Sequence, residues 1–139
     1  ARARAIGKRL GASLAVIDKR RGGPNETEVL NVVGDVEGRN VLILDDIIDT
    51  AGTLVQAEEA LRGHGALRTF AAAVHPVFSG PARQRIEASK LETLFVTNTI
   101  PLDDSMKNCR KIHTLSVAPL LGEAIQRIHQ GASVSSLFV

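Results

Sequence analysis

Aromatic residues are scarce in this chain of 139 residues: they make up 3% of it, and Trp and Tyr are absent. Proteins that hold single-stranded nucleic acid stack its bases on aromatic side chains, so that class of partner is disfavoured. The single cysteine, Cys109, excludes an internal disulfide and a cysteine-rich metal site, and it suits the reducing cytoplasm. No apolar run approaches the roughly 20 residues of a membrane span, and no signal peptide is visible.

The chain also lacks a large excess of charge of either sign. The 17 Lys and Arg residues nearly balance the 15 Asp and Glu residues, which leaves a formal charge of +2. This balance argues against a polybasic nucleic-acid surface and favours a local anion site. Hydrophobic residues make up 44% of the chain, which is enough for the core of one domain spanning residues 1–139.

The first eleven residues have the spacing of an amphipathic helix, with Ala5, Ile6 and Leu10 on one side and basic residues between them. Neither an initiator Met nor an N-cap residue precedes this pattern. We therefore expect the chain to be a piece of a longer protein.

Apolar strands and amphipathic helices alternate along the rest of the chain. Strands are predicted at residues 13–18, 29–33, 41–44, 67–75, 91–96 and 111–115, and helices after Leu54, after the Ser79-Gly80-Pro81 start and from Val117 to His129. Such alternation predicts an α/β fold with a mostly parallel sheet and helices on both faces. Residues 19–35 are charged and contain glycines, which predicts a projecting flap.

The segment from Val41 to Thr53 carries the chemistry. A continuous apolar strand runs into Asp45 and Asp46, and a short loop with Asp49 then leads into Thr50-Ala51-Gly52-Thr53 and a helix. In open α/β sheets, ligands bind beyond the carboxyl ends of the strands. Small residues let backbone N–H groups approach an anion, and the helix N-terminus adds about half a positive charge.

These parts predict a phosphate cradle with carboxylates beside it. Carboxylates accept hydrogen bonds strongly, so they suit the hydroxyl groups of a sugar phosphate. Adjacent residues of a strand point to opposite faces, so one acid of the Asp45-Asp46 pair is expected to face the sugar and the other a metal ion or the loop backbone. Each feature alone favours the simpler interpretation of an acidic strand end followed by a turn that caps a helix, and only their combination favours a binding site.

The whole segment resembles the motif with which phosphoribosyltransferase-fold proteins bind phosphoribosyl pyrophosphate (PRPP). Further segments are similar to the ribose-phosphate pyrophosphokinase family within that fold: residues 2–5, Asp18-Lys19-Arg20-Arg21, residues 31–38, Asn98-Thr99-Ile100-Pro101, residues 116–121 and residues 133–138. The similarity covers nearly the whole chain, in the order of the family. Gly22-Gly23 is a departure from its usual pattern.

The resemblance implies an enzyme that transfers the diphosphoryl group of ATP to the anomeric hydroxyl of ribose 5-phosphate, giving PRPP and AMP. It assigns charge stabilisation to Lys19 and Arg21 of a catalytic loop within residues 19–35, together with Mg²⁺. Asp45 is the candidate metal ligand. The expected ribose-5-phosphate site comprises Asp45, Asp46, Asp49, Thr50, Ala51, Gly52 and Thr53.

The family also implies partners and regulation. Most of the ATP site would lie in an N-terminal half that these residues do not include, so the piece alone is expected to bind the sugar phosphate without turnover. A homo-oligomer, dimer or hexamer, is expected. Ser133, Ser135 and Ser136 are candidates for an allosteric site at subunit contacts.

Two other functions remain open from the sequence. A transferase that consumes PRPP would share the motif, but it would need a base-binding segment that is not found here. A non-catalytic regulatory relative of the synthetase would alter the catalytic loop or the acids, whereas Lys19, Arg21 and Asp49 are all present.

Overall fold

The computed structural model describes residues 2–20 and 29–138. Its helices and strands, in chain order, are α1 (Arg2–Leu10), β1 (Val16–Arg20), β2 (Val29–Val33), β3 (Asn40–Ile48), α2 (Gly52–Gly63), β4 (Arg68–Pro76), α3 (Ala82–Ala88), β5 (Thr93–Thr97), α4 (Asp104–Lys107), β6 (Ile112–Leu115), α5 (Ala118–His129) and the 3₁₀ helix η1 (Ser135–Phe138).

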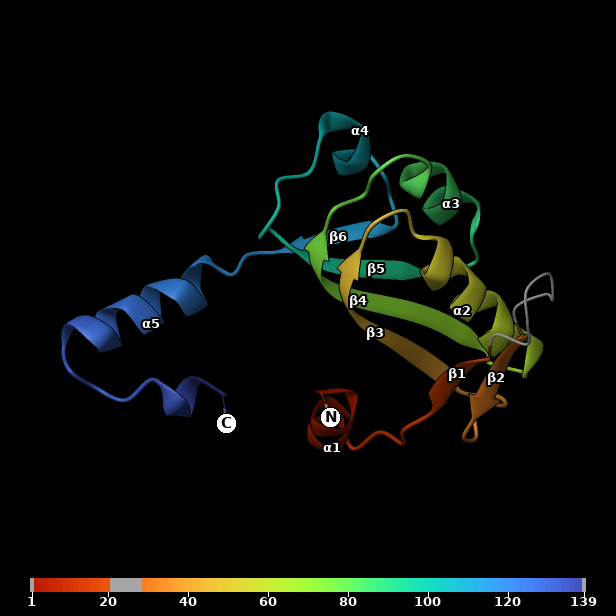
Figure 1. Ribbon diagram of the computed structural model, residues 1–139, viewed down its shortest axis with the longest axis horizontal. Helices are drawn as coiled ribbons and strands as arrows, with labels where there is room; N and C mark the ends of the chain where they lie inside the picture. The colour runs from red at the N-terminus through yellow and green to blue at the C-terminus, as the bar shows by residue number, and fades with distance from the viewer. Residues whose placement is uncertain (1, 21–28, 139) are drawn as a thin grey trace.

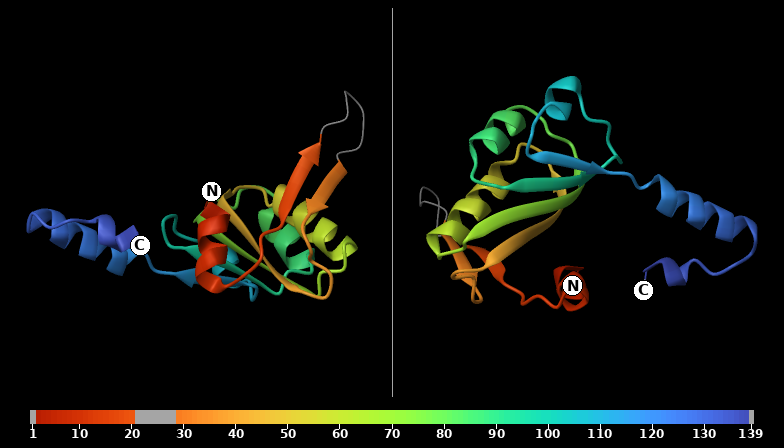
Figure 2. Two further views of the ribbon diagram at one scale, coloured as in Figure 1. Left: turned by 90° about the horizontal axis from the view of Figure 1, so that it is seen from below. Right: turned by 180° about the vertical axis from the view of Figure 1, so that it is seen from behind.

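Four strands form one parallel sheet in the order β3-β4-β5-β6, so each strand lies beside the next one in the sequence. Parallel neighbours require crossover connections, which are almost always right-handed. Successive right-handed crossovers in one direction place their helices on the same face, and α2 and α3 both pack there (Figures 1 and 2). The predicted α/β fold with a parallel sheet flanked by helices is confirmed. The opposite face keeps Leu42, Val74 and Leu115 partly exposed.

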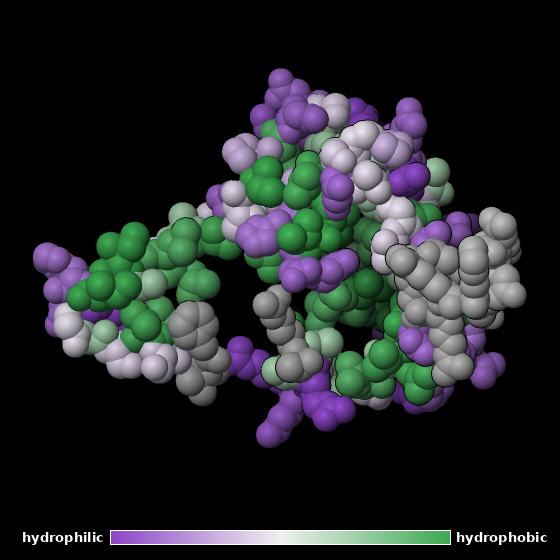
Figure 3. Space-filling model, in the orientation of Figure 1, coloured by the Kyte–Doolittle hydropathy of each residue, from purple (hydrophilic) through white to green (hydrophobic). Residues whose placement is uncertain are grey.

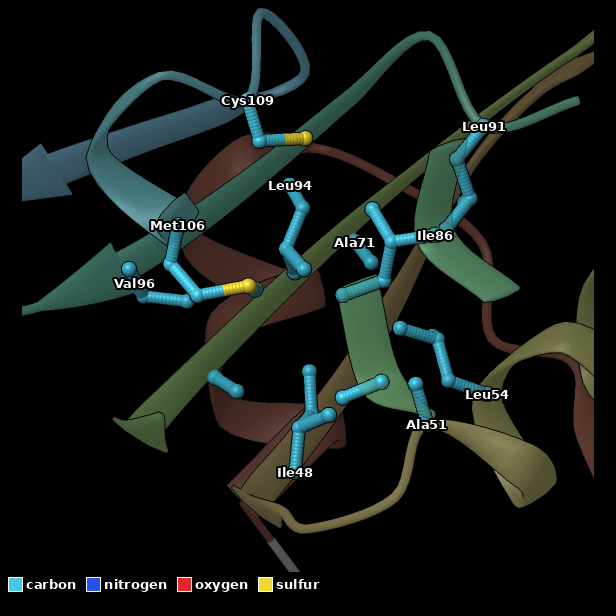
Figure 4. Packing of buried hydrophobic residues seen from close by; sticks show 12 residues of the cluster. Ile48, Ala51, Leu54, Ala71, Ile86, Leu91, Leu94, Val96, Met106 and Cys109 are labelled. Atoms are coloured by element: carbon cyan, nitrogen blue, oxygen red, sulfur yellow. The ribbon is translucent and has the colours of Figure 1, made fainter. Parts of the chain in front are cut away.

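The main core lies between the sheet and these two helices. Alternate residues of β4 and β5, such as Ala71, Leu94 and Val96, are at most 1% exposed, as expected for strands covered on this face. Figure 4 shows that Ile86 of α3 joins them. Ile48, Ala51 and Leu54 belong to the same cluster, so both ends of the β3–α2 loop are anchored in the core.

The flap is an antiparallel hairpin. β1 and β2 pair from Val16 with Val33 to Arg20 with Val29, and the two strands project from the body (Figure 2). The hairpin therefore begins three residues before the predicted start at Lys19. Ile17 and Val32 pack against a buried cluster of Val36, Leu61 and Ala66, and this cluster joins the hairpin to α2 because Leu61 belongs to that helix.

The outer edge of β3 is open. Within residues 2–20 and 29–138, β3 pairs with β4 alone, and the hairpin forms a separate sheet. A hollow of about 1380 Å³ lies between this edge and α1, and it is lined by residues of α1, of the segment 11–17, of the β2–β3 connection, of β3 and of α2. This edge therefore leaves a row of backbone N–H and C=O groups of β3 without a partner strand among the described residues.

Helix α5 extends away from the sheet and carries the C-terminal segment with it (Figure 1). Its apolar residues Leu120, Leu121, Ile125 and Ile128 are 48–69% exposed, and they form the hydrophobic surface of the projecting arm in Figure 3. Among the residues that the structure describes, no helix combines the length and apolar character needed to cross a membrane.

Several predicted boundaries shift. The first strand begins at Val16 instead of Ser13, and α4 and η1 were not predicted. Helix α4 is short and is capped by the Asp103 carboxylate, which accepts a hydrogen bond from the Met106 N–H at 2.8 Å. Four residues are too few to show a helical period, so hydrophobic spacing could not predict this helix.

Glu58 is a charged residue inside the α2 interface, with 1% of its surface exposed. Its carboxylate accepts a hydrogen bond from the Lys90 N–H at 3.3 Å and a long one from the Thr69 hydroxyl at 3.5 Å. The Arg62 guanidinium lies 3.6 Å away on the next turn. A buried carboxylate is tolerated only when it is paired, and these groups join α2 to β4 and to the α3–β5 connection.

We expect Glu58→Ala to destabilise the fold by about 2–3 kcal/mol, because the Lys90 N–H and the buried Thr69 hydroxyl lose their acceptor. Chemical denaturation measures the change. Glu59→Ala, at the exposed neighbouring position, is the control and should change the free energy of unfolding by less than about 0.5 kcal/mol. Equal stability of the two variants would show that Glu58 contributes nothing through this network.

Candidate active site

Strand β3 is longer than its apolar run suggests. It continues through Asp45 and Asp46 and ends at Ile48, with Asp45 opposite Ala73 and Ile48 opposite Pro76. The expectation that the two acids mark the end of the strand was therefore wrong. The ladder to β4 supplies the backbone hydrogen bonds that keep polar residues in extended conformation. Both acids remain near the carboxyl edge of the sheet, and their side chains leave β3 on opposite faces.

The β3–α2 loop turns on Ala51. This residue is the N-cap of α2 and adopts a left-handed conformation, with φ 59° and ψ 10°. Such a conformation costs an L-residue about 1–2 kcal/mol. Ala51 is also 4% exposed, so its methyl group is held in the core at the turn. Alanine has no polar side chain to cap the helix, and the first N–H groups of α2 are left to point out of its N-terminus.

A cleft of about 300 Å³ lies over this helix N-terminus. It is lined by Asp45, Asp49, Thr50, Ala51, Gly52 and Thr53, with Ile47, Ile48 and Leu54. Six of the seven predicted sugar-phosphate ligands therefore meet in one place. Asp46 does not line the cleft, in agreement with the opposite directions of adjacent strand residues. Of the predicted residues, only Asp45 and Thr53 reach the larger hollow beside α1.

The connection from β4 to α3 supports the loop from outside. The N–H groups of Val77 and Phe78 donate to the Ile48 carbonyl oxygen at 3.0 and 3.1 Å. Ser79 donates twice to Asp49, from its N–H to the carbonyl oxygen at 3.1 Å and from its hydroxyl to the carboxylate. Ser79 was predicted to cap α3, and this was wrong: Pro81 is the N-cap, and the Ser79 hydroxyl is engaged by Asp49 instead.

Besides the contact of Ser79 with Asp49, the sequence analysis also missed a role for Arg85 of α3. Its Nη1 donates to the Thr50 carbonyl oxygen at 2.9 Å. A Cβ atom placed on Gly52 would lie 3.2 Å from the same nitrogen, so Gly52 leaves room for the guanidinium beside the loop. The sequence offered no signal for this contact, because an arginine on an amphipathic helix is usually a solvated surface residue.

The acids by themselves make an incomplete metal site. The described residues contain no group of three or more His, Cys, Asp and Glu side chains that would hold a metal ion. The Asp45 carboxylate accepts a hydrogen bond from the Asp46 N–H at 2.8 Å. Mg²⁺ is commonly held by one or two carboxylates together with phosphate oxygens and water. Asp45 at the cleft fits such a shared site and does not fit a cage made by the protein alone.

Of the two predicted catalytic residues, one lies on the hairpin. Lys19 is in β1, with its Cα opposite Leu30, and Arg21 lies outside the described residues. The structure therefore places the backbone of Lys19 on a hairpin that packs against α2, the helix whose N-terminus lies under the cleft.

The three predicted allosteric serines lie on the C-terminal segment, folded back on α5. Arg127 donates from Nη1 to the Ser133 carbonyl oxygen at 3.1 Å and to the Ser136 hydroxyl. The Ser135 N–H donates to the Ser133 hydroxyl at 3.2 Å. Arg127 also pairs with Glu123 at 2.6 Å, so one arginine organises the segment.

The pKa values that clearly shift belong to groups outside the cleft. Hydrogen bonds from the Ser105 hydroxyl and the Met106 N–H lower the pKa of Asp103 at the start of α4. The Arg68 guanidinium, 3.2 Å away, lowers the pKa of Glu92 through a hydrogen bond and its charge. Both carboxylates are surface groups that stabilise local structure.

Comparison with known proteins decides the family. A family model described as the phosphoribosyl synthetase-associated domain matches residues 13–139. The chain belongs to this family. The resemblance to ribose-phosphate pyrophosphokinases is thereby confirmed. The residues that line the cleft all lie within the matched domain.

Relatives and solved structures agree with this membership. The chain is 58% identical to the ribose-phosphate pyrophosphokinase of Listeria ivanovii and 54% identical to that of Bordetella pertussis, each over 137 residues, or 99% of the chain. A crystal structure of phosphoribosylpyrophosphate synthetase from Mycobacterium smegmatis superposes with a TM-score of 0.84 at 37% identity. It covers 94% of this chain and 41% of its own.

The synthetase-associated domain described here is shorter than these proteins. It spans 43% of the Listeria ivanovii relative and 44% of the Bordetella pertussis relative. The activity of the longer proteins therefore cannot be assigned to this chain from the similarity alone.

We expect Gly52→Val to weaken the binding of inorganic phosphate about tenfold, because the valine would displace the Arg85 guanidinium from the loop and crowd the cleft. Phosphate titration followed by NMR measures the affinity. Gly63→Ala is a matched control, since a Cβ atom there meets nothing within 4 Å and the position lies at the other end of α2. Unchanged affinity in Gly52→Val would mean that the anion does not approach the backbone here.

Proposed function

We propose that the chain is the ribose-5-phosphate half of a ribose-phosphate diphosphokinase. That enzyme transfers the diphosphoryl group of ATP to the anomeric hydroxyl of ribose 5-phosphate and yields PRPP and AMP. The observation that carries the proposal is the 300 Å³ cleft, where carboxylates and small loop residues meet above the N-terminus of α2. The names of the relatives support the reaction class.

The roles of the loop residues follow from their chemistry. The N–H groups at the start of α2 and the hydroxyls of Thr50 and Thr53 donate to the 5-phosphate, with the helix dipole adding positive potential. Asp49 accepts hydrogen bonds from the ribose hydroxyls. One of its oxygens already accepts from Ser79, which fixes the carboxylate without using all of its acceptor sites. Asp46, on the opposite face of β3, is proposed to approach the sugar from outside the cleft.

Charge stabilisation is assigned to the hairpin. The reaction builds negative charge on the bridging and leaving oxygens of the diphosphoryl group, and Lys19 and Arg21 are proposed to offset it. The packing of the hairpin on the buried cluster that contains Leu61 supports this role, because α2 then links the phosphate cradle and the basic flap. Mg²⁺ bound with ATP would supply further positive charge, with Asp45 as its ligand from this chain.

The remaining features stay predictions. Most of the ATP site is proposed to come from protein outside these 139 residues, so the chain alone is expected to bind ribose 5-phosphate and leave ATP intact. Assembly into a homo-oligomer, an allosteric role for Ser133, Ser135 and Ser136, and a cytoplasmic location complete the proposal.

The first test is phosphorus NMR of the chain with Mg²⁺, ATP and ribose 5-phosphate. A shift or broadening of the sugar-phosphate signal with intact ATP is the expected result. Growth of AMP and PRPP signals would show that these residues suffice for catalysis. No change in any signal would remove the binding site from this chain.

We expect Asp49→Asn to weaken ribose 5-phosphate binding by about ten- to hundredfold, because a neutral amide replaces a charged acceptor for the ribose hydroxyls. Calorimetry gives the affinity. The same variant should bind inorganic phosphate at least as well as the parent chain, since the removed charge repels the anion. Asp104→Asn, on exposed α4, is the control. Equal loss for both ligands would indicate a disturbed loop and no contact with the sugar.

We expect Lys19→Ala in the complete enzyme to lower kcat by about 10²- to 10³-fold while KM for ribose 5-phosphate changes little, because the charge acts in the transition state. Steady-state kinetics separate the two constants. Lys107→Ala is the control, since Lys107 pairs with Asp104 on α4 at 2.8 Å. A change confined to KM would contradict the catalytic role.

A further inference from the structure

Arg85 reaches the β3–α2 loop from a different βα unit. It lies on α3, 35 residues from Thr50, and its Nη1 donates to the Thr50 carbonyl oxygen at 2.9 Å. The same guanidinium occupies the space beside Gly52. No other side chain of the described residues is seen to hold this carbonyl group.

The Thr50 carbonyl and the Ala51 N–H belong to one planar trans peptide, so they point in opposite directions. A donor that fixes the carbonyl therefore fixes the direction of the N–H as well. With the carbonyl on Arg85, the Ala51 N–H points away from α3. Ala51 is in the lining of the cleft.

Because Ala51 has a left-handed conformation, the Thr50–Ala51 peptide has a second possible orientation. Rotation of the Thr50–Ala51 peptide by half a turn changes ψ of Thr50 and φ of Ala51 together. It would carry Ala51 from φ 59° to a negative φ, which an L-residue prefers. The rotation would also reverse the N–H. The observed loop is therefore the less favourable of two orientations unless something holds the carbonyl.

We propose that Arg85 is a positioning residue that holds the Thr50–Ala51 peptide in the orientation that presents the Ala51 N–H to the anion. Ser79 holds Asp49 at the other end of the loop and places no hydrogen bond on this peptide. The inference rests on the proposed function only for the identity of the ligand, which is the phosphate group of ribose 5-phosphate. A loop held in this way binds more tightly, because only a fraction of a relaxed ensemble is competent to bind.

The decisive test compares Arg85→Ala with the same change in an Ala51→Gly background. Arg85→Ala is expected to weaken binding of ribose 5-phosphate and of inorganic phosphate about tenfold by calorimetry, in proportion to the lost competent fraction. Glycine adopts positive φ without penalty, so Ala51→Gly should restore most of the loss. A guanidinium that simply touched the phosphate would not be replaced by a glycine, and absence of restoration overturns the proposal.

Two further variants serve as controls for this comparison. Arg85→Met keeps the aliphatic stem without the donors, so it should behave as Arg85→Ala even if truncation disturbs packing. Arg83→Ala lies on the same helix and removes an arginine that pairs with Glu87 at 2.9 Å. It should leave both affinities unchanged. A loss equal to that of Arg85→Ala would show that the effect comes from the positive charge of α3 and not from the hydrogen bond to Thr50.

A readout without ligand separates this inference from the proposed function. Crystal structures of the unliganded parent and of Arg85→Ala report φ of Ala51 directly. A change to negative φ in the variant supports the positioning role, and retention of positive φ overturns it. If the parent chain binds neither ribose 5-phosphate nor phosphate, the proposed function fails while the φ comparison still decides what Arg85 holds.

Discussion

The candidate site depends on one residue that belongs to the core and to the loop at once. Ala51 places its methyl group among buried residues, and its backbone takes the left-handed turn that starts α2. Burial of a methyl group contributes about 0.8 kcal/mol, while the turn costs about 1–2 kcal/mol. The difference has to come from neighbouring contacts. Core packing therefore fixes where the loop lies, and hydrogen bonds from outside fix its shape.

Those contacts come from the next βα unit in the chain. The segment between β4 and α3 supplies N–H donors to Ile48 and both donors to Asp49, and α3 supplies Arg85. Parallel strands that are neighbours in sequence bring successive loops to the same edge of the sheet. The cleft is accordingly built by two loops, one that lines it and one that braces the first.

Much of this arrangement could be predicted from the sequence, and the exceptions have physical reasons. The acids, the small residues and the helix that follows them are local signals, so the sequence could predict that six of the seven candidate residues lie together, whereas Asp46 lies apart and three apolar residues also line the cleft. The length of β3 was underestimated because Asp45 and Asp46 interrupt its apolar run, whereas pairing with β4 keeps the strand extended. Ser79 and Arg85 act across 30 and 35 residues of sequence, and no local pattern encodes such contacts. The roles of Lys19 and Arg21 came from family resemblance alone.

The open edge of β3 has a consequence for the behaviour of the isolated chain. An edge strand offers a row of unpaired backbone groups to any extended chain that approaches it. β3 has few of the features that usually prevent such pairing: its run Val41–Leu44 carries no charge and no proline, and it borders the hollow beside α1. Because the apolar side of α5 is also exposed, we expect the isolated chain to self-associate as its concentration rises. A segment of a longer protein that covered this edge would therefore also keep the protein soluble, because it would prevent strand pairing between molecules.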